Sequence, residues 1–414
     1  MKNSILIMST FVLTCSSSFA QKEELKDLER AFKKNNTEEA RLILNKIEEH
    51  LPDASDDQKA AYYYYKVQYE TRELDSEKEN NFDKRAQAIS SINRLIAFEN
   101  ETKSKKYTSQ IMSIKNELLA KIVNEAIQNN SANDFKKSSR LFEQAFRLSK
   151  SDTMYLYYAA SDAANGRDYD FAESKYKELI ALNFDGRSEN YVATSELDGK
   201  VQSFGTDMKA RDLAVKNGTH NNPETERSKT VRPEIYYNLG LILLNKQNYS
   251  EAEEIVVKAH ELAPNNINAL MNVLMLYYNT NRIDVYEDYA KKGLENFPKN
   301  ENLLYNLAVI HLNNEKHEQA RNFFNRIIDN NPTHFESLRE LGNLELQEDV
   351  EITTQINALP NTIASDVKRE ELMKRKRTIY ENALKYFLKA QKVNDKDSGL
   401  NELITQIQGF LNKQ

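Results

Sequence analysis

The 414-residue chain has 10 glycines and 7 prolines, far below the roughly 7% and 5% of an average protein. So few helix breakers indicate a helical fold with few turns, because glycine and proline dominate turns. With 63 acidic and 57 basic residues the net charge is −6, which excludes the basic excess that nucleic-acid binding requires.

The first twenty residues, 1–20, predict a secretory signal peptide. Lys2 precedes a short apolar run, and small residues lead up to Ala20, after which cleavage is expected. The run is shorter than the about twenty residues that cross a bilayer. Lipidation at Cys15, the only cysteine, is the less favoured alternative, because Thr14 before it is not the small residue usual there. We therefore expect a periplasmic or secreted mature chain without disulfides, thiolate metal sites or a membrane span.

From residue 21 to residue 184, apolar residues recur with the spacing of helices. Residues 21–118 predict degenerate N-terminal helical repeats, and 119–184 predict further helix pairs. The run Tyr62–Tyr65 covers all sides of its helix, so at least one ring is expected to be exposed. The small and apolar residues that carry the helical pattern are Ala40, Leu44, Ile47, Ala88, Ile92, Leu95, Ala126, Phe142, Ala145, Ala159, Ala160, Ala172, Tyr176 and Leu179.

Residues 185–232 interrupt the helices. Alternating apolar residues on either side of Asp198 and Gly199 predict a β-hairpin over 190–204, because Asp-Gly is a favoured two-residue hairpin turn. A short helix is expected over 211–215. The segment 218–231 is polar and is expected to be mobile.

The clearest pattern is a repeat. Pro264, Pro298 and Pro332 recur at one constant interval and divide 233–334 into three consecutive units of equal length. Each unit carries two helical stripes, and the proline marks the next unit because it cannot continue a helix. The residues at the repeated positions are Tyr236, Leu239, Gly240, Leu243, Ala252, Val256 and Ala259 in the first unit and Leu304, Leu307, Ala308, His311, Ala320, Phe324 and Ile327 in the third.

This pattern resembles the tetratricopeptide-repeat (TPR) family, exported bacterial type. By the same resemblance, the helix pairs over 119–184 are expected to be TPR-like repeats. The resemblance implies an all-α fold, a right-handed superhelical solenoid of TPR helix pairs, with the small β-hairpin as an insertion. A further repeat, 335–396, is interrupted after Leu341 and Gly342 and resumes at Ala383. We expect its first helix to reach near residue 355, its second to begin near 366, and a capping helix over 397–414.

The resemblance also implies a concave groove that binds a partner. Asn238, Asn272 and Asn306 recur at the same interval as the prolines, at a helix position that faces this groove in the family. A carboxamide can pair with a peptide backbone, so the three are candidate peptide-binding residues and are expected to point away from the core. The alternative is that they are consensus residues without a binding role. The neighbours expected to line the same face are Tyr237, Met271, Met275, Tyr278 and Tyr305.

A second set of asparagines recurs at the turn within each unit. Asn245, Asn279 and Asn313 are expected to cap the first helix, because asparagine tolerates left-handed backbone angles. His311 lies where the family has tyrosine and is expected to be packed there. No histidine in the sequence has the spacing of a metal ligand.

No motif indicates catalysis, a metal or a cofactor, so the chain is not expected to be an enzyme.

The favoured function is a non-catalytic protein–protein interaction scaffold of the cell envelope. Its protein or peptide partner would lie in the concave groove or on the 185–232 insertion. The alternative is a glycan-binding accessory protein of a nutrient-uptake system. The sequence contains no tryptophan, which counts against a site that stacks sugars on aromatic rings.

Overall fold

The fold was analysed in a computed structural model that describes residues 22–76 and 82–412. The chain divides into two compact units, Met1–Ile242 and Leu243–Gln414, which are described separately. The all-α class is confirmed, with one small sheet in the first unit. The predicted signal peptide lies outside the described residues. Within the described part, no helix has the length and apolar character needed to cross a membrane.

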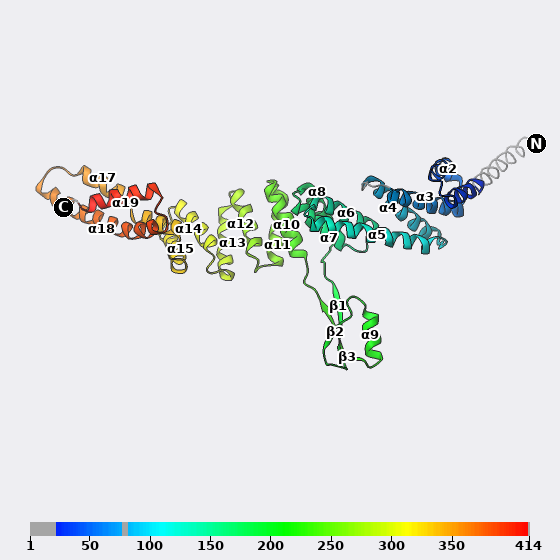
Figure 1. The fold of residues 1–414 in the computed structure, drawn as a ribbon. Coiled ribbons are helices and arrows are strands. Elements are labelled where there is room, and N and C mark those ends of the chain that lie inside the picture. The colour runs from blue at the N-terminus through cyan, green and yellow to red at the C-terminus, as the bar shows by residue number, and fades with distance from the viewer. Residues whose placement is uncertain (1–21, 77–81, 413–414) are drawn as a thin grey trace, which may run out of the picture. The chain divides into compact units, whose positions relative to one another are not determined.

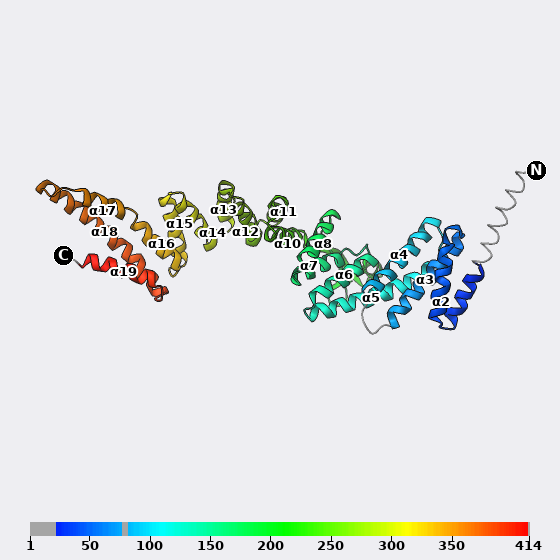
Figure 2. The ribbon, with the colours of Figure 1, turned by 90° about the horizontal axis from the view of Figure 1, so that it is seen from above.

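The first unit is built from helices that pack on their neighbours in the sequence (Figures 1 and 2). After a helical segment at 22–33, its helices are α2 (Thr37–Glu49), the short 3-10 helix η1 (Leu51–Asp53), α3 (Asp56–Ser76), α4 (Phe82–Thr102), α5 (Thr108–Ser131), α6 (Phe135–Leu148), α7 (Met154–Asn165) and α8 (Tyr169–Ala181). Helix α6 is central, because it packs against α4, α5 and α7. Its residues Leu141, Ala145 and Leu148 are buried in the same core as Ile92 and Leu95 of α4.

The tyrosine run in α3 is more enclosed than predicted. Tyr62 is buried and the other three tyrosines of the run are half-buried, so the expectation of an exposed ring is wrong. The reason is that aromatic partners cover the helix on more than one side. Tyr64 stacks on Tyr107, with ring centroids 4.4 Å apart, and Tyr65 stacks on Phe32 at 5.2 Å.

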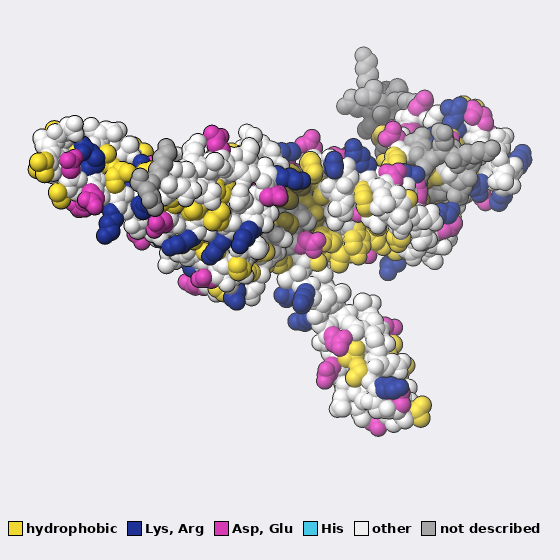
Figure 3. Space-filling model, turned by 60° about the vertical axis from the view of Figure 1, so that its left-hand side comes forward, with side chains coloured by type: hydrophobic (Ala, Val, Ile, Leu, Met, Phe, Trp, Pro, Cys, Tyr) yellow, Lys and Arg dark blue, Asp and Glu magenta, His cyan; other side chains and the backbone are white. Residues whose placement is uncertain are grey.

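The insertion forms a three-stranded antiparallel sheet in the order β2-β1-β3. Its elements are β1 (Glu189–Ser195), β2 (Val201–Ser203), α9 (Met208–Lys216) and β3 (His220–Arg227). The predicted hairpin is confirmed, with Val192 opposite Ser203. Figure 3 shows hydrophobic side chains at the surface of this insertion, between acidic and basic ones. Leu197 at its turn is 95% exposed, and Val201 at the start of β2 is 66% exposed.

The third strand was not predicted, because the sequence of 218–231 shows only a polar segment. Strand β3 pairs along the free edge of β1, so backbone hydrogen bonds hold it although its side chains are almost all exposed. A β-bulge interrupts the register between Val192 and Thr194 of β1. On β3 this irregularity falls at Asn222, which has a φ of +45°, and Pro223. A proline is tolerated there because β3 is an edge strand.

The second unit continues with regular helix pairs. Helix α10 (Arg232–Asn245) contains the boundary between the two units. The helices that follow are α11 (Tyr249–Leu262), α12 (Ile267–Asn279), α13 (Ile283–Asn296), α14 (Glu301–Asn313), α15 (His317–Asn330), α16 (Phe335–Glu345), α17 (Asp349–Ala358), α18 (Ile363–Val393) and α19 (Ser398–Leu411). Consecutive helices from α11 to α16 pack on one another, which buries the apolar stripe of each.

The recurring turn asparagines end their helices but do not carry the left-handed backbone. Asn279 and Asn313 are the last residues of α12 and α14. The positive φ angles fall two residues later, at Asn281 (55°) and Glu315 (58°). The C-caps are Thr280 and Asn314, and each left-handed residue follows its cap. The prediction that Asn279 and Asn313 are the caps is therefore wrong by one position.

The interrupted repeat differs from its prediction in one respect. Instead of one first helix that reaches residue 355, α16 ends at Glu345 and a separate helix, α17, follows. The break allows α17 to pack against α18 and to bury Ile352. Asp349 at the start of α17 pairs with Lys376 of α18, 2.8 Å from its ammonium group. Helix α18 begins at Ile363, slightly before the predicted start.

Candidate functional site

A pocket of about 340 Å³ lies in the second unit between α12, α13 and α14, and we call it the α12–α14 pocket. Five of the eight candidate residues line it, which are Met271, Met275 and Tyr278 of α12 with Tyr305 and Asn306 of α14. Its other lining residues are Leu274, Tyr286, Val309, Ile310 and Asn313. These five candidate residues from α12 and α14 therefore meet at one concave site.

Helical spacing explains how α12 supplies one wall. Leu270, Val273 and Leu274 bury their side chains in the core of the unit. Met271, Met275 and Tyr278 follow the i, i+4, i+7 spacing of an adjacent stripe, so they share one face of the helix. Their exposure rises along that stripe, from half-buried methionines to Tyr278, which is 63% exposed.

Tyr286 forms the deep end of the pocket. Its side chain is only 4% exposed, and its ring meets that of Tyr278 edge-on with centroids 6.4 Å apart. Burial raises the pKa of Tyr286, while a hydrogen bond from the Asn306 amide opposes this shift. The phenol therefore stays protonated at neutral pH and keeps a hydroxyl hydrogen that it can donate.

The lining residues give the pocket a defined chemistry. None of them carries a charge at neutral pH. Burial, followed by the carboxylates of Glu340 and Glu336, raises the pKa of Tyr305, so this phenol is also neutral. Methionine is unbranched and polarisable, and tyrosine combines an apolar ring with a polar tip, which suits adaptable protein contacts. The pocket can accept an uncharged apolar or aromatic group and offer hydrogen bonds from hydroxyls and amides.

The three asparagines of the repeated position have three different environments. Asn306 lines the pocket and bonds to Tyr286, whereas the Asn238 amide donates to the hydroxyl of Tyr176 over 3.1 Å in the first unit. Asn272 is only 5% exposed, and its Nδ2 is buried without a hydrogen-bond partner. The expectation that all three point away from the core is therefore wrong for Asn272.

The remaining candidates do not reach this pocket. Tyr237 and Asn238 belong to the first unit and are half-buried in α10. Asn272 is on α12 but does not line the pocket.

Tyr286 is one of five lining residues that the sequence prediction missed, with Leu274, Val309, Ile310 and Asn313, and the repeat contains a signal for Tyr286. The equivalent positions in the neighbouring repeats, one repeat length before and after, hold Ala252 and Ala320. Both alanines are completely buried. A tyrosine in place of an alanine introduces a ring and a hydroxyl where the other repeats have a close helix contact.

His311 is buried beside this region, as expected, and is 4% exposed. Its ring stacks on Phe323 with centroids 5.5 Å apart, and its Nε2 lies 3.5 Å from a carboxylate oxygen of Glu287. In the described part of the chain, no group of three or more histidine, cysteine, aspartate or glutamate side chains could hold a metal ion.

Comparisons with known proteins identify the repeats. Tetratricopeptide-repeat family models match residues 233–266 and residues 289–322. The first match spans α10 and α11, and the second runs from α13 into α15. These two segments are tetratricopeptide repeats. No curated protein matches the sequence.

Several solved structures are similar to the chain. They include YrrB, described as a TPR protein with an unusual peptide-binding site, at 17% identity over 56% of this chain and 96% of that one, with a TM-score of 0.38. A TPR-repeat protein from Bacteroides fragilis matches at 15% identity over 62% and 98%, with a TM-score of 0.37. PilF from Pseudomonas aeruginosa matches at 11% identity over 71% and 98%, with a TM-score of 0.36.

Proposed function

We propose that the chain is a non-catalytic protein-binding scaffold whose α12–α14 pocket holds an apolar or aromatic side chain of a protein partner. The observation that carries the proposal is the meeting of Met271, Met275, Tyr278, Tyr305 and Asn306 at one pocket. Asn306 is a candidate by its repeat position, and the other four are neighbours that the sequence predicts on the same face. Tetratricopeptide repeats commonly act through protein–protein contact, which supports the same function.

The pocket chemistry favours an extended partner segment. Tyr278 at the mouth offers a largely exposed ring that a partner would cover, and burial of such rings often supplies much of the binding energy. Asn313 is also exposed at the pocket and presents a carboxamide that can pair with peptide groups. The absence of charge in the lining disfavours a charged side chain inside the pocket, because its desolvation would be uncompensated.

We further propose that the mature chain is exported to the cell envelope. The support is the sequence of residues 1–20, with Lys2, an apolar run and a small-residue site ending at Ala20. Mass spectrometry of the native protein tests this proposal. A mature chain that starts at Gln21 is expected, and a diacylglyceryl group on Cys15 would contradict it.

A comparative pull-down tests the binding function. The wild-type chain, Tyr278→Ala and Tyr169→Ala are immobilised and exposed to envelope extract, and a glycan array is probed in parallel. Tyr169 is the matched control because it is 43% exposed and lies outside the pocket. We expect a protein that the wild type and Tyr169→Ala retain and Tyr278→Ala loses. Equal retention by Tyr278→Ala, or binding to glycans alone, would refute the proposal.

A further inference from the structure

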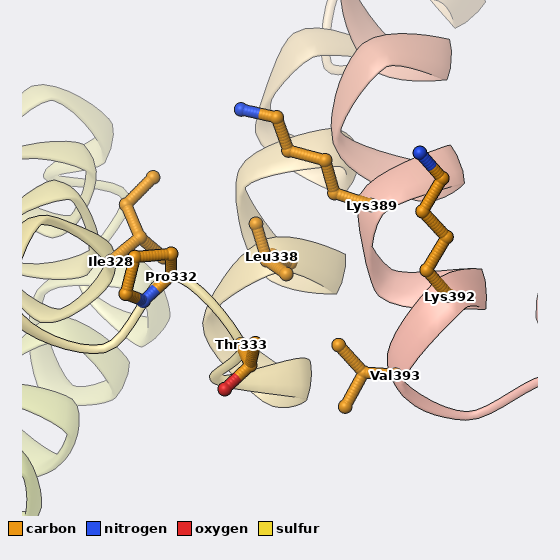
Figure 4. A pocket seen from close by; sticks show the side chains of 7 residues that line it. All are labelled: Ile328, Pro332, Thr333, Leu338, Lys389, Lys392 and Val393. Atoms are coloured by element: carbon orange, nitrogen blue, oxygen red, sulfur yellow. The ribbon is translucent and has the colours of Figure 1, made fainter.

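A second pocket of about 410 Å³ lies in the second unit where α15, α16 and α18 meet, and we call it the α15–α18 pocket. Figure 4 shows Ile328 and Pro332 on one side, Leu338 in the middle, and the α18 side chains across from them. Its lining residues are Ile328, Pro332, Thr333, Leu338, Lys389, Lys392 and Val393. It shares no residue with the α12–α14 pocket.

The floor of the α15–α18 pocket is apolar. Leu338 is 1% exposed and belongs to the core cluster of this region, and Ile328 packs partly buried against the same cluster. Pro332 is exposed at the edge, and Val393 at the end of α18 is 43% exposed. The cavity therefore reaches from solvent down to the core and would gain free energy by taking up an apolar side chain.

The only charged residues of the lining are two lysines. Lys389 and Lys392 are exposed and lie one turn apart on α18, so they share one face of the helix. Neither forms an ion pair with any residue of the described chain, whereas Lys376 of the same helix pairs with Asp349. Cations near a helix C-terminus are favoured by the helix dipole, which explains Lys392 but not the cavity beside it.

We propose that the α15–α18 pocket docks an acidic segment of a partner protein, in which a large apolar side chain is flanked by aspartate or glutamate. The apolar side chain enters between Leu338, Ile328 and Val393. The flanking carboxylates pair with Lys389 and Lys392 at the rim. Charge complementarity selects this occupant, because an apolar cavity flanked by two unpaired cations matches an apolar group flanked by anions.

A fluorescent peptide of sequence Asp-Glu-Phe-Leu-Glu-Asp is the probe, titrated with the full chain by fluorescence polarisation at low ionic strength. A peptide with asparagine and glutamine in place of the acids is its neutral counterpart. We expect the acidic peptide to bind at least about fivefold more tightly, and added salt to reduce this preference, because rim charges are screened. Equal affinity for the two peptides would overturn the proposal.

Charge reversal locates the binding. The double variant Lys389→Glu/Lys392→Glu should lower the affinity for the acidic peptide by about tenfold or more. Lys374 is an exposed lysine of α18 outside the lining, so the affinity of Lys374→Glu should stay within about twofold of the wild-type value. Thr333→Trp, which fills the cavity from the opposite side, should also reduce binding. Unchanged affinity in the double variant refutes the site. Binding of laurate without binding of the peptide also refutes it, because the pocket would then belong to an anionic lipid.

Discussion

A β-carbon added to Gly342 would lie 2.3 Å from Cε1 of Phe387. Gly342 is on α16 and Phe387 is on α18, and the sequence between them contains the whole α17 insertion. The phenyl ring occupies the space that any other residue at 342 would need. The contact thus joins the two halves of the interrupted repeat, and its closeness requires glycine at this position.

Gly342→Ala should therefore destabilise the second unit by about 1–3 kcal/mol, the usual cost of overpacking a core. Gly409→Ala is the matched control, because Gly409 is also helical but has no atom within 4 Å of an added β-carbon. Alanine favours helix more than glycine does, so this control should be as stable as the wild type or slightly more. Thermal melts measure both variants. Equal melting temperatures for the two would show that α16 and α18 are not held at this distance.

The buried Asn272 gives a prediction about stability. Its Nδ2 is unpartnered, so Asn272→Leu removes a buried polar group that makes no hydrogen bond and should be neutral or stabilising by about 1 kcal/mol. Asn306→Leu removes the bond to Tyr286 and should destabilise by a similar amount. Chemical denaturation of the two variants checks the contrast. If Asn272→Leu lost as much stability as Asn306→Leu, Asn272 would have a partner in the native state.

Asp162 is expected to stabilise the first unit through its hydrogen bonds. It is 5% exposed and accepts hydrogen bonds from Ser138 Oγ at 2.6 Å and from Asn130 Nδ2 at 2.7 Å, and so connects α5, α6 and α7. Asp162→Ala leaves both donors without this acceptor and should cost about 2–4 kcal/mol. Asp162→Asn keeps an acceptor oxygen and should cost less. Denaturation midpoints measure the difference, and equal losses would mean that the hydrogen bonds are not the source of the stability.

Acid should weaken the second unit through its histidines. Burial lowers the pKa of His260 and of His311 below the usual value of 6.5. Around His311, Glu287 favours the charged form, whereas Lys316 and Lys291 oppose it. A histidine with a lowered pKa binds protons more weakly in the folded than in the unfolded chain. Its contribution to stability is therefore complete above the unfolded pKa and is lost progressively as the pH falls from that value through the lower folded pKa.

Melting temperatures at pH 7.5 and pH 5.5 test this effect. The wild type should lose more stability on acidification than His260→Gln/His311→Gln, since glutamine does not titrate. An equal loss in both proteins would assign the acid sensitivity to other groups.

The helical class and the hairpin could be predicted because both leave a local pattern. Prolines at a constant interval mark the repeats, and Asp198 with Gly199 marks the turn. Strand β3 could not be predicted, because backbone pairing to β1 holds it and its side chains are polar and exposed. The break after Glu345 likewise depends on packing between α17 and α18, which the local sequence does not encode.

For the candidate site, repeat position was informative for α12 and α14 but did not determine burial. The same position places Asn306 at the pocket and Asn272 in the interior. The difference arises from the neighbouring helix, which offers Tyr286 to Asn306, whereas α11 buries only Ala252, Val256 and Ala259. A hydroxyl on the preceding helix therefore decides whether the asparagine finds a partner.

The central claim, that the α12–α14 pocket binds a protein segment, is tested most directly by one affinity comparison. Peptides selected from a random library on the wild-type chain are titrated against wild type, Tyr278→Ala and Tyr169→Ala by fluorescence polarisation. The account predicts that Tyr278→Ala binds about tenfold or more weakly with an unchanged melting temperature, while Tyr169→Ala keeps wild-type affinity. Unchanged affinity in Tyr278→Ala, with binding lost instead in Leu197→Asp at the exposed hairpin turn, would contradict it and place the binding surface on the insertion.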